Sequence, residues 1–210
     1  MAQLIGVPYL SVVAAARNDD HGGNLLRRLQ IFVNALVGQA NRHRLPVELV
    51  LAEWNPPAEK PPLIEALRWP ADPGFCAIRI VTVPADIHRR YLHWEAQPLY
   101  QMVAKNAGIR RAKGEFILAT NVDILLSDEL MRFLAARRLQ PGRMYRTDRH
   151  DVKEDVPVDA GIEDQLAYCS GHRLRINARE GTFNLTPEGY PVPRPADIAR
   201  SGDGIFFGRG

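Results

Sequence analysis

The chain has 210 residues, of which 46% are apolar and 24% are charged. This length fits one globular domain or a closely joined pair of half-domains, and such a chain buries enough surface to fold without a disulfide or a metal. The 27 Lys and Arg residues exceed the 24 Asp and Glu residues by three, with both signs mixed along the chain. This balance excludes a strongly basic nucleic-acid binder and a disordered acidic chain.

Targeting and thiol signals are weak. The sequence has no apolar run of about 18 residues, so no transmembrane segment is predicted. The apolar start lacks a Lys or Arg before Arg17, which favours a first buried strand over a secretion signal, and we expect a cytoplasmic protein. Cys76 and Cys169 lack the spacing of a disulfide framework or a paired-thiol zinc site, so both are expected to be free and at least partly buried.

The first half of the chain alternates short apolar runs with longer amphipathic ones. A nearly continuous apolar run over 9–16 predicts a strand buried on both faces, and apolar residues at three- and four-residue spacing predict a helix over 25–40. The same patterns predict a strand over 47–52, a short helix over 63–69, a strand over 77–83, a helix over 98–112 and a strand over 115–120.

Further elements are expected after residue 120. Ser127 should cap a helix with acidic residues in its first turn and basic residues in its last, as the helix dipole favours. A fifth strand is predicted at 144–146 and a helix over 165–169. Strands separated by helices predict an α/β protein with a mainly parallel sheet. Frequent Pro and Gly predict a loop-like tail over 181–210.

Ligands of an open α/β sheet bind at the carboxyl ends of its strands. Three of the predicted strands end in carboxylates, which repel one another unless a cation or a donor-rich ligand lies among them. The sequence has neither the Gly-x-Gly-x-x-Gly of a dinucleotide site nor a P-loop. A bound diphosphate would therefore be neutralised in another way, most simply by a divalent metal on a carboxylate.

The stretch KNAGIRRAKGEFILATNVD, from Lys105 to Asp123, resembles the core signature of nucleotide-diphospho-sugar glycosyltransferases of the GT-A fold, in particular glycosyltransferase family 2. Leu10 to Asn18 resembles the first strand of that family, and Val47 to Glu53 resembles its second. The resemblance implies a three-layer α/β/α sandwich with a mainly parallel central sheet. It also implies transfer of a sugar from a UDP- or GDP-sugar to a hydroxyl of a glycan or other acceptor, with inversion, as in polysaccharide biosynthesis.

The resemblance implies a role for each matching residue. Arg17 and Asn18 would lie beside the nucleotide, and Glu53 would accept hydrogen bonds from the base or the ribose. Lys105 and Asn106 would lie near the base and the phosphates.

The metal motif of the family is only half matched. Asn121 replaces the first acid of the Asp-x-Asp motif and would remain a nucleotide contact, whereas Asp123 is the second acid and would hold Mg²⁺ or Mn²⁺ against the diphosphate. Glu163 and Asp164 are the candidates for the general base that deprotonates the acceptor hydroxyl. The same pair fits the solvated first turn of a helix equally well.

The predicted organisation is a nucleotide-sugar-binding domain over 1–180, with a donor half over 1–147 and an acceptor-side half over 148–180, followed by the tail. Two alternatives stay open. Asn121 and the weak pattern after residue 145 fit a catalytically weak or silent nucleotide-binding module. A sugar-phosphate nucleotidyltransferase would need a glycine-rich first loop with an arginine, which Gly22 and Gly23 match poorly. Trp54, Trp69 and Trp94 are expected to be packing residues.

Overall fold

A computed structural model describes residues 6–193 of the chain. The chain divides into two compact units after Leu139, and each unit is described by itself. The part of the predicted tail beyond residue 193 lies outside the described residues.

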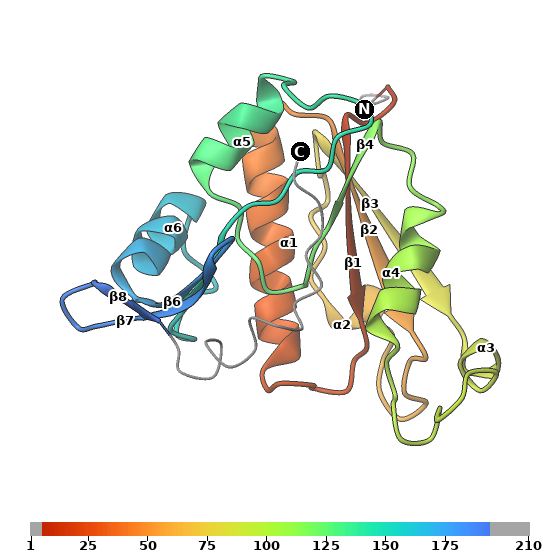
Figure 1. Ribbon diagram of the computed structural model, residues 1–210. Helices are drawn as coiled ribbons and strands as arrows, with labels where there is room; N and C mark the ends of the chain where they lie inside the picture. The colour runs from red at the N-terminus through yellow and green to blue at the C-terminus, as the bar shows by residue number, and fades with distance from the viewer. Residues whose placement is uncertain (1–5, 194–210) are drawn as a thin grey trace. The chain divides into compact units, whose positions relative to one another are not determined.

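The first unit is built on a four-stranded parallel sheet, whose strand order is β3-β2-β1-β4 (Figure 1). The strands are β1 (Leu10–Ala16), β2 (Val47–Trp54), β3 (Cys76–Val83) and β4 (Phe116–Ala119). Because the strands are parallel, their carboxyl ends lie at one edge. The order reverses between β1 and β4, which is the point where open α/β sheets bind ligands.

Helices cover both faces of this sheet (Figure 1). Leu10, Val12 and Ala14 of β1 belong to one core, together with α1 (Leu25–Arg42) and α5 (Asp128–Ala135). Ala15 of β1 belongs to a second core on the opposite face, together with α4 (Gln101–Ile109). The nearly continuous apolar run of β1 is therefore buried on both faces, and the first unit has the expected three α/β/α layers.

Two glycines within the stretch 105–123 are required by packing. A Cβ on Gly108 of α4 would lie 2.7 Å from Val13 Cγ1, so the helix approaches the sheet closely at this position. A Cβ on Gly114 would lie 2.6 Å from the backbone nitrogen of Ser11. Part of the pattern that resembles a glycosyltransferase signature thus has a structural role here.

Among the remaining helices of the first unit, α2 and α3 are short, and α5 has the predicted Ser127 cap. α2 (Leu63–Ala66) ends before the predicted residue 69, and α3 (Ala85–His88) was not predicted. Ser127 caps α5, and its Oγ accepts a hydrogen bond from Leu130 N at 3.2 Å. No helix within residues 6–193 is long and apolar enough to cross a membrane.

Over residues 140–193, the second unit contains an antiparallel sheet in the order β5-β6-β7-β8 and the helix α6 (Ile162–Gly171). Its strands are β5 (Arg149–Val152), β6 (Arg173–Ala178), β7 (Gly181–Leu185) and β8 (Pro191–Pro193). The strand predicted at 144–146 is wrong, because those residues form no strand and the chain enters its sheet at Arg149. Strands β7 and β8 occupy a region that was expected to be a loop-like tail.

Candidate functional site at the carboxyl edge of the parallel sheet

Four polar side chains form a cluster at the carboxyl end of β4, named here the β4-edge cluster: Arg28, Lys105, Asn121 and Asp123. Lys105 Nζ on α4 donates a hydrogen bond to Asn121 Oδ1 at 2.8 Å. Arg28 Nη1 on α1 donates to Asp123 Oδ2 at 2.8 Å. The structure thus brings together three of the predicted site residues and adds Arg28.

Arg28 was missed by the sequence interpretation, although it leaves a signal. It lies in the first turn of α1, which contains no acidic residue, and the dipole of a helix disfavours positive charge at that end. A cation at an unfavourable helix position indicates a partner elsewhere. Asp123, 95 positions along the chain, is that partner.

Two opposing effects act on the pKa of Lys105 in the β4-edge cluster. Burial lowers the pKa of Lys105 below its ordinary value of 10.5, and the negative charge of Asp123 acts in the opposite direction with a smaller effect. The Asp123 side chain is 38% exposed. A partly desolvated cation beside a half-exposed acid, at the carboxyl edge of a parallel sheet, is the kind of perturbed group that marks functional sites.

Arg28 also fixes the loop that follows β1. Its Nε donates to Gly23 O at 3.0 Å, and its Nη2 donates to His21 O at 2.8 Å. Gly22 and Gly23 have φ values of +75° and +74°, which glycine adopts without strain. One guanidinium therefore connects the loop after β1 with the end of β4.

Arg17 and Asn18 hold neighbouring loops of the protein. Arg17 Nε donates to Asn55 O at 2.6 Å, and its Nη1 donates to Asp19 Oδ2 at 2.9 Å. Asn18 is 4% exposed and donates from Nδ2 to Pro61 O at 2.9 Å. Both residues lie at the predicted edge, where they link the ends of β1 and β2.

Glu53 is fully buried at the end of β2. Its Oε1 accepts a hydrogen bond from Leu63 N at 2.7 Å, and its Oε2 accepts one from Thr82 Oγ1 at 3.4 Å. The carboxylate therefore fixes the start of α2 to the end of the sheet. Strand β1 lies between β2 and β4, so Glu53 belongs to a different part of the edge than Asp123.

The remaining predicted residues lie on helix surfaces. Asn106 is exposed on α4. Glu163 and Asp164 are exposed in the first turn of α6, as the solvated-turn interpretation expected, and they belong to the second unit.

One oxygen of Asp123, the predicted metal ligand, and the amide oxygen of the neighbouring Asn121 are engaged by other groups. Asn121 Oδ1 accepts hydrogen bonds from Lys105 and from Gln101 Nε2, the latter at 3.1 Å, while Asp123 pairs with Arg28. Within residues 6–193, no group of three or more His, Cys, Asp or Glu side chains could hold a metal ion. Mg²⁺ requires unengaged oxygen ligands, so the arranged side chains do not fit a ready-made cation site.

An aromatic cluster supports the loop between α3 and α4. Trp54 Nε1 donates a hydrogen bond to His88 Nδ1 at 2.8 Å, and His88 Nε2 lies 2.9 Å from Trp94 O. The Tyr100 hydroxyl donates to Leu92 O. Because an indole nitrogen only donates, His88 Nδ1 accepts, and the proton of this ring lies on Nε2. Trp54 is buried, as its expected packing role requires.

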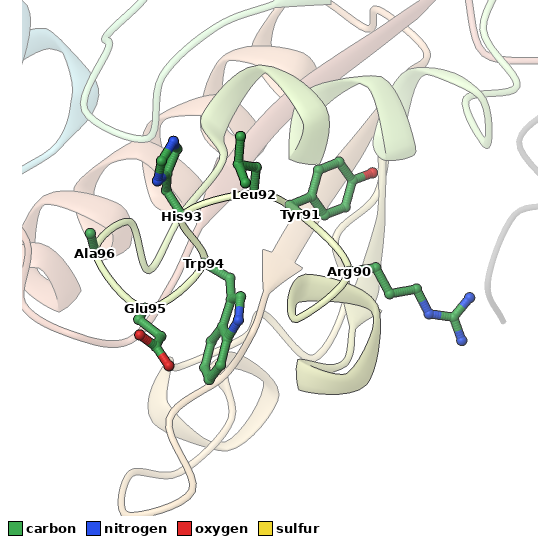
Figure 2. Close-up of a pocket in the computed structure, with 7 residues that line it drawn as sticks. All are labelled: Arg90, Tyr91, Leu92, His93, Trp94, Glu95 and Ala96. Carbon is green, nitrogen blue, oxygen red and sulfur yellow. The ribbon is translucent and has the colours of Figure 1, made fainter.

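This loop borders a shallow, open pocket of about 620 Å³ that is lined by Arg90 to Ala96 (Figure 2). Figure 2 shows Trp94 and Glu95 pointing to one side of the loop and Leu92 and His93 to the other. The side chains do not converge on one point. The β4-edge cluster, in which cations, an amide and a carboxylate contact one another, is therefore the stronger candidate site.

No protein-family model, no curated protein and no solved structure matches the chain. The fold and the site define the class: an α/β protein with a parallel sheet in the order β3-β2-β1-β4 and a polar cluster at its switch point.

Proposed function

We propose that the first unit binds a nucleoside-diphosphate sugar at the β4-edge cluster and that the protein is a glycosyltransferase. The observation that carries the proposal is the contact between Lys105 and Asn121, beside Asp123, at the switch point between β1 and β4. A ligand with two phosphates and several hydroxyl groups matches a cluster with two cations and polar acceptors. The resemblance of the stretch 105–123 to family 2 supports the same donor class.

The proposed reaction places charge on the diphosphate. The oxygen of an acceptor hydroxyl bonds to the anomeric carbon while the bond from that carbon to the phosphate oxygen breaks, and the electron pair leaves with the nucleoside diphosphate. Positive side chains stabilise this charge as it develops, and Lys105 is held for that role by Asn121. The Mg²⁺ or Mn²⁺ expected at Asp123 stays a prediction, and no step of the proposal depends on it.

The acceptor hydroxyl loses its proton to a carboxylate, for which Glu163 and Asp164 remain the proposed candidates. Both are exposed to solvent in the first turn of α6. By analogy with family 2, the transfer inverts the anomeric centre; this stereochemistry rests on analogy alone.

The test is turnover of UDP-glucose, UDP-N-acetylglucosamine and GDP-mannose, followed by release of UDP or GDP. Lys105→Met should lower kcat/KM by about tenfold or more, because a charged hydrogen-bond donor to the leaving group is lost. Arg132→Gln is the matched control, since Arg132 is an exposed residue of α5 outside the cluster. Equal rates for Lys105→Met and wild type would contradict the proposal.

A second candidate is a nucleotide-binding module without transfer activity. It is favoured by the contacts that Glu53 and Asn18 make within the protein: both oxygens of Glu53 and Nδ2 of Asn18 form hydrogen bonds with neighbouring residues. Binding of UDP or GDP without turnover of any sugar donor would select this candidate. Release of pyrophosphate from a sugar phosphate and a nucleoside triphosphate would instead select the nucleotidyltransferase alternative.

A further inference from the structure

The β4-edge cluster contains two cations and one carboxylate, and one oxygen of Asp123 and the amide oxygen of Asn121 each have a cationic partner. Asn121 Oδ1 accepts from Lys105 Nζ at 2.8 Å, and Asp123 Oδ2 accepts from Arg28 Nη1 at 2.8 Å. A divalent ion bound to these oxygens would meet the repulsion of both side chains and would have to displace Arg28. A diphosphate would meet attraction from the same two groups.

We propose that Arg28 and Lys105 neutralise the diphosphate of the donor, so that the nucleotide binds without a divalent metal ion. This inference rests on the proposed function, because it specifies the charge partner of the same ligand. It departs from the metal site that the resemblance implies, and the reason is the engagement of Asn121 and Asp123.

The geometry of Arg28 suits this role. Two of its nitrogens are fixed by backbone carbonyl groups, since Nε donates to Gly23 O and Nη2 donates to His21 O. The remaining nitrogen, Nη1, reaches Asp123. When a diphosphate binds, Nη1 can exchange a carboxylate oxygen for a phosphate oxygen while the other two bonds hold the guanidinium in place. Such a charge-assisted contact is directional, and little side-chain entropy remains to be lost.

Lys105 complements Arg28 from the opposite face of the sheet. It extends from α4, whereas Arg28 extends from α1, and the two helices belong to different layers. The Lys105 amino group is positioned by Asn121 and is attracted by the charge of Asp123. Asp123 thus holds both cations at the edge in the absence of ligand, as a positioning residue that the diphosphate replaces.

The test is titration of the full chain with UDP and with GDP by calorimetry, in EDTA and in MnCl₂. The affinity of the wild-type protein should differ by less than about threefold between the two conditions. Arg28→Gln and Lys105→Met should each lower the affinity in EDTA by about tenfold or more. Arg132→Gln removes the same charge outside the cluster and should change the affinity by less than about twofold.

Asp123→Asn separates the two mechanisms by the sign of its effect. If cationic side chains neutralise the diphosphate, this variant loses a competing negative charge, and its affinity should rise by about threefold or more. If a metal does so, the variant loses a ligand of the ion. A tenfold gain in affinity from Mn²⁺, abolished by Asp123→Asn, would overturn the inference and leave the proposed function intact. No binding of UDP or GDP in either condition would overturn the proposed function itself. Circular dichroism of each variant checks that it is folded.

Discussion

The parallel sheet carries a charged cluster at each of its two edges, and the clusters differ in what they leave open to solvent. At the amino edge, the Glu48 side chain of β2 is 4% exposed and contacts β1, β3 and the segment before β4. Its Oε1 accepts from Ser11 Oγ at 2.5 Å and from the N–H groups of Lys113 and Gly114, and its Oε2 accepts from Arg79 at 2.9 Å. At the carboxyl edge, Asp123 is 38% exposed and contacts Arg28.

This difference separates a structural acid from one whose ion pair lies partly open to solvent. Glu48 has both oxygens saturated by β1, β3 and the segment before β4, so it joins the strands and offers nothing to a ligand. A buried carboxylate is tolerated when its hydrogen bonds are complete. At the carboxyl edge, Asp123 and Arg28 are paired with one another and partly exposed, and this is the pair that we propose a diphosphate exchanges.

The largest difference between the two edges is expected when each acid is removed, beginning with Glu48→Ala. The substitution leaves Ser11, Lys113 N–H and Arg79 without their acceptor, so the free energy of unfolding should fall by about 2–4 kcal/mol. Asp123→Ala at the other edge should lower it by less than about 1 kcal/mol, because exposed ion pairs contribute little. Urea unfolding measures both. Equal losses of unfolding free energy would contradict the assignment of Glu48 alone to the structural framework.

Lowering the pH should remove the stability that the ionised Glu48 carboxylate contributes at the amino edge. Burial raises the pKa of the Glu48 carboxyl, but hydrogen bonds from Ser11 and Lys113 N–H and the charge of Arg79 outweigh it, and the pKa lies below the ordinary 4.5. Glu48 therefore contributes stability above pH 4.5, which is lost as the pH falls through the lowered folded value. Urea unfolding of wild type and Glu48→Gln from pH 7 to 3 should show a gap that narrows below pH 4.5. A constant gap would contradict this assignment.

The close packing of Gly114 gives a further test of how tightly the amino edge is built. Gly114→Ala places a Cβ against the backbone of Ser11 at the amino edge and should lower the free energy of unfolding by about 1–3 kcal/mol. The control is Gly38→Ala on the exposed face of α1, where a Cβ meets nothing within 4 Å. That change should raise stability by about 0.5–1 kcal/mol, because alanine favours the helix. Opposite signs in thermal unfolding are the expected result.

The smallest stability effect is expected at Lys105. Because burial lowers the pKa of Lys105, its charged form is disfavoured in the folded protein, and Lys105→Met should leave the free energy of unfolding unchanged or raise it by up to about 1 kcal/mol at pH 7. The same variant should lose nucleotide affinity, as described above. A loss of stability larger than 1 kcal/mol would assign Lys105 to the framework together with Glu48.

The parallel sheet was predictable because its strands are buried on both faces and form apolar runs. The second unit was not predicted, and its strands differ in the signal that they leave. β5 is short, polar at three of its four positions and exposed at residues 149 and 150, so it carries no alternation. β6 does alternate, because Leu174, Ile176 and Ala178 lie between Arg173, Arg175 and Asn177, and this strand signal was overlooked. The weak apolar signal of Met144 and Tyr145 led to the wrong strand at 144–146, where both side chains are exposed.

The candidate site was predictable in position and less so in detail. Strand ends gave Asn121 and Asp123, but the sequence did not reveal that Glu53 folds inward onto Leu63 N, because an acid at a strand end has the same pattern in either role. Glu48 left a usable signal, since a charge inside the apolar run Val47-Glu-Leu-Val-Leu-Ala52 requires buried partners. The position of Arg28 in the first turn of α1 indicates that it needs a partner, but the identity of that partner, 95 positions away, is not visible in any local pattern.

The single proton of His88 limits what can replace this residue. The side chain must accept from Trp54 on one side and donate to Trp94 O on the other, with both groups at fixed places. Asparagine and glutamine offer one acceptor and one donor and are the natural substitutes, whereas lysine offers only donors and phenylalanine offers neither. A library of His88 variants should therefore retain amides alone, and the shape of the loop over 89–97 would survive only in those members.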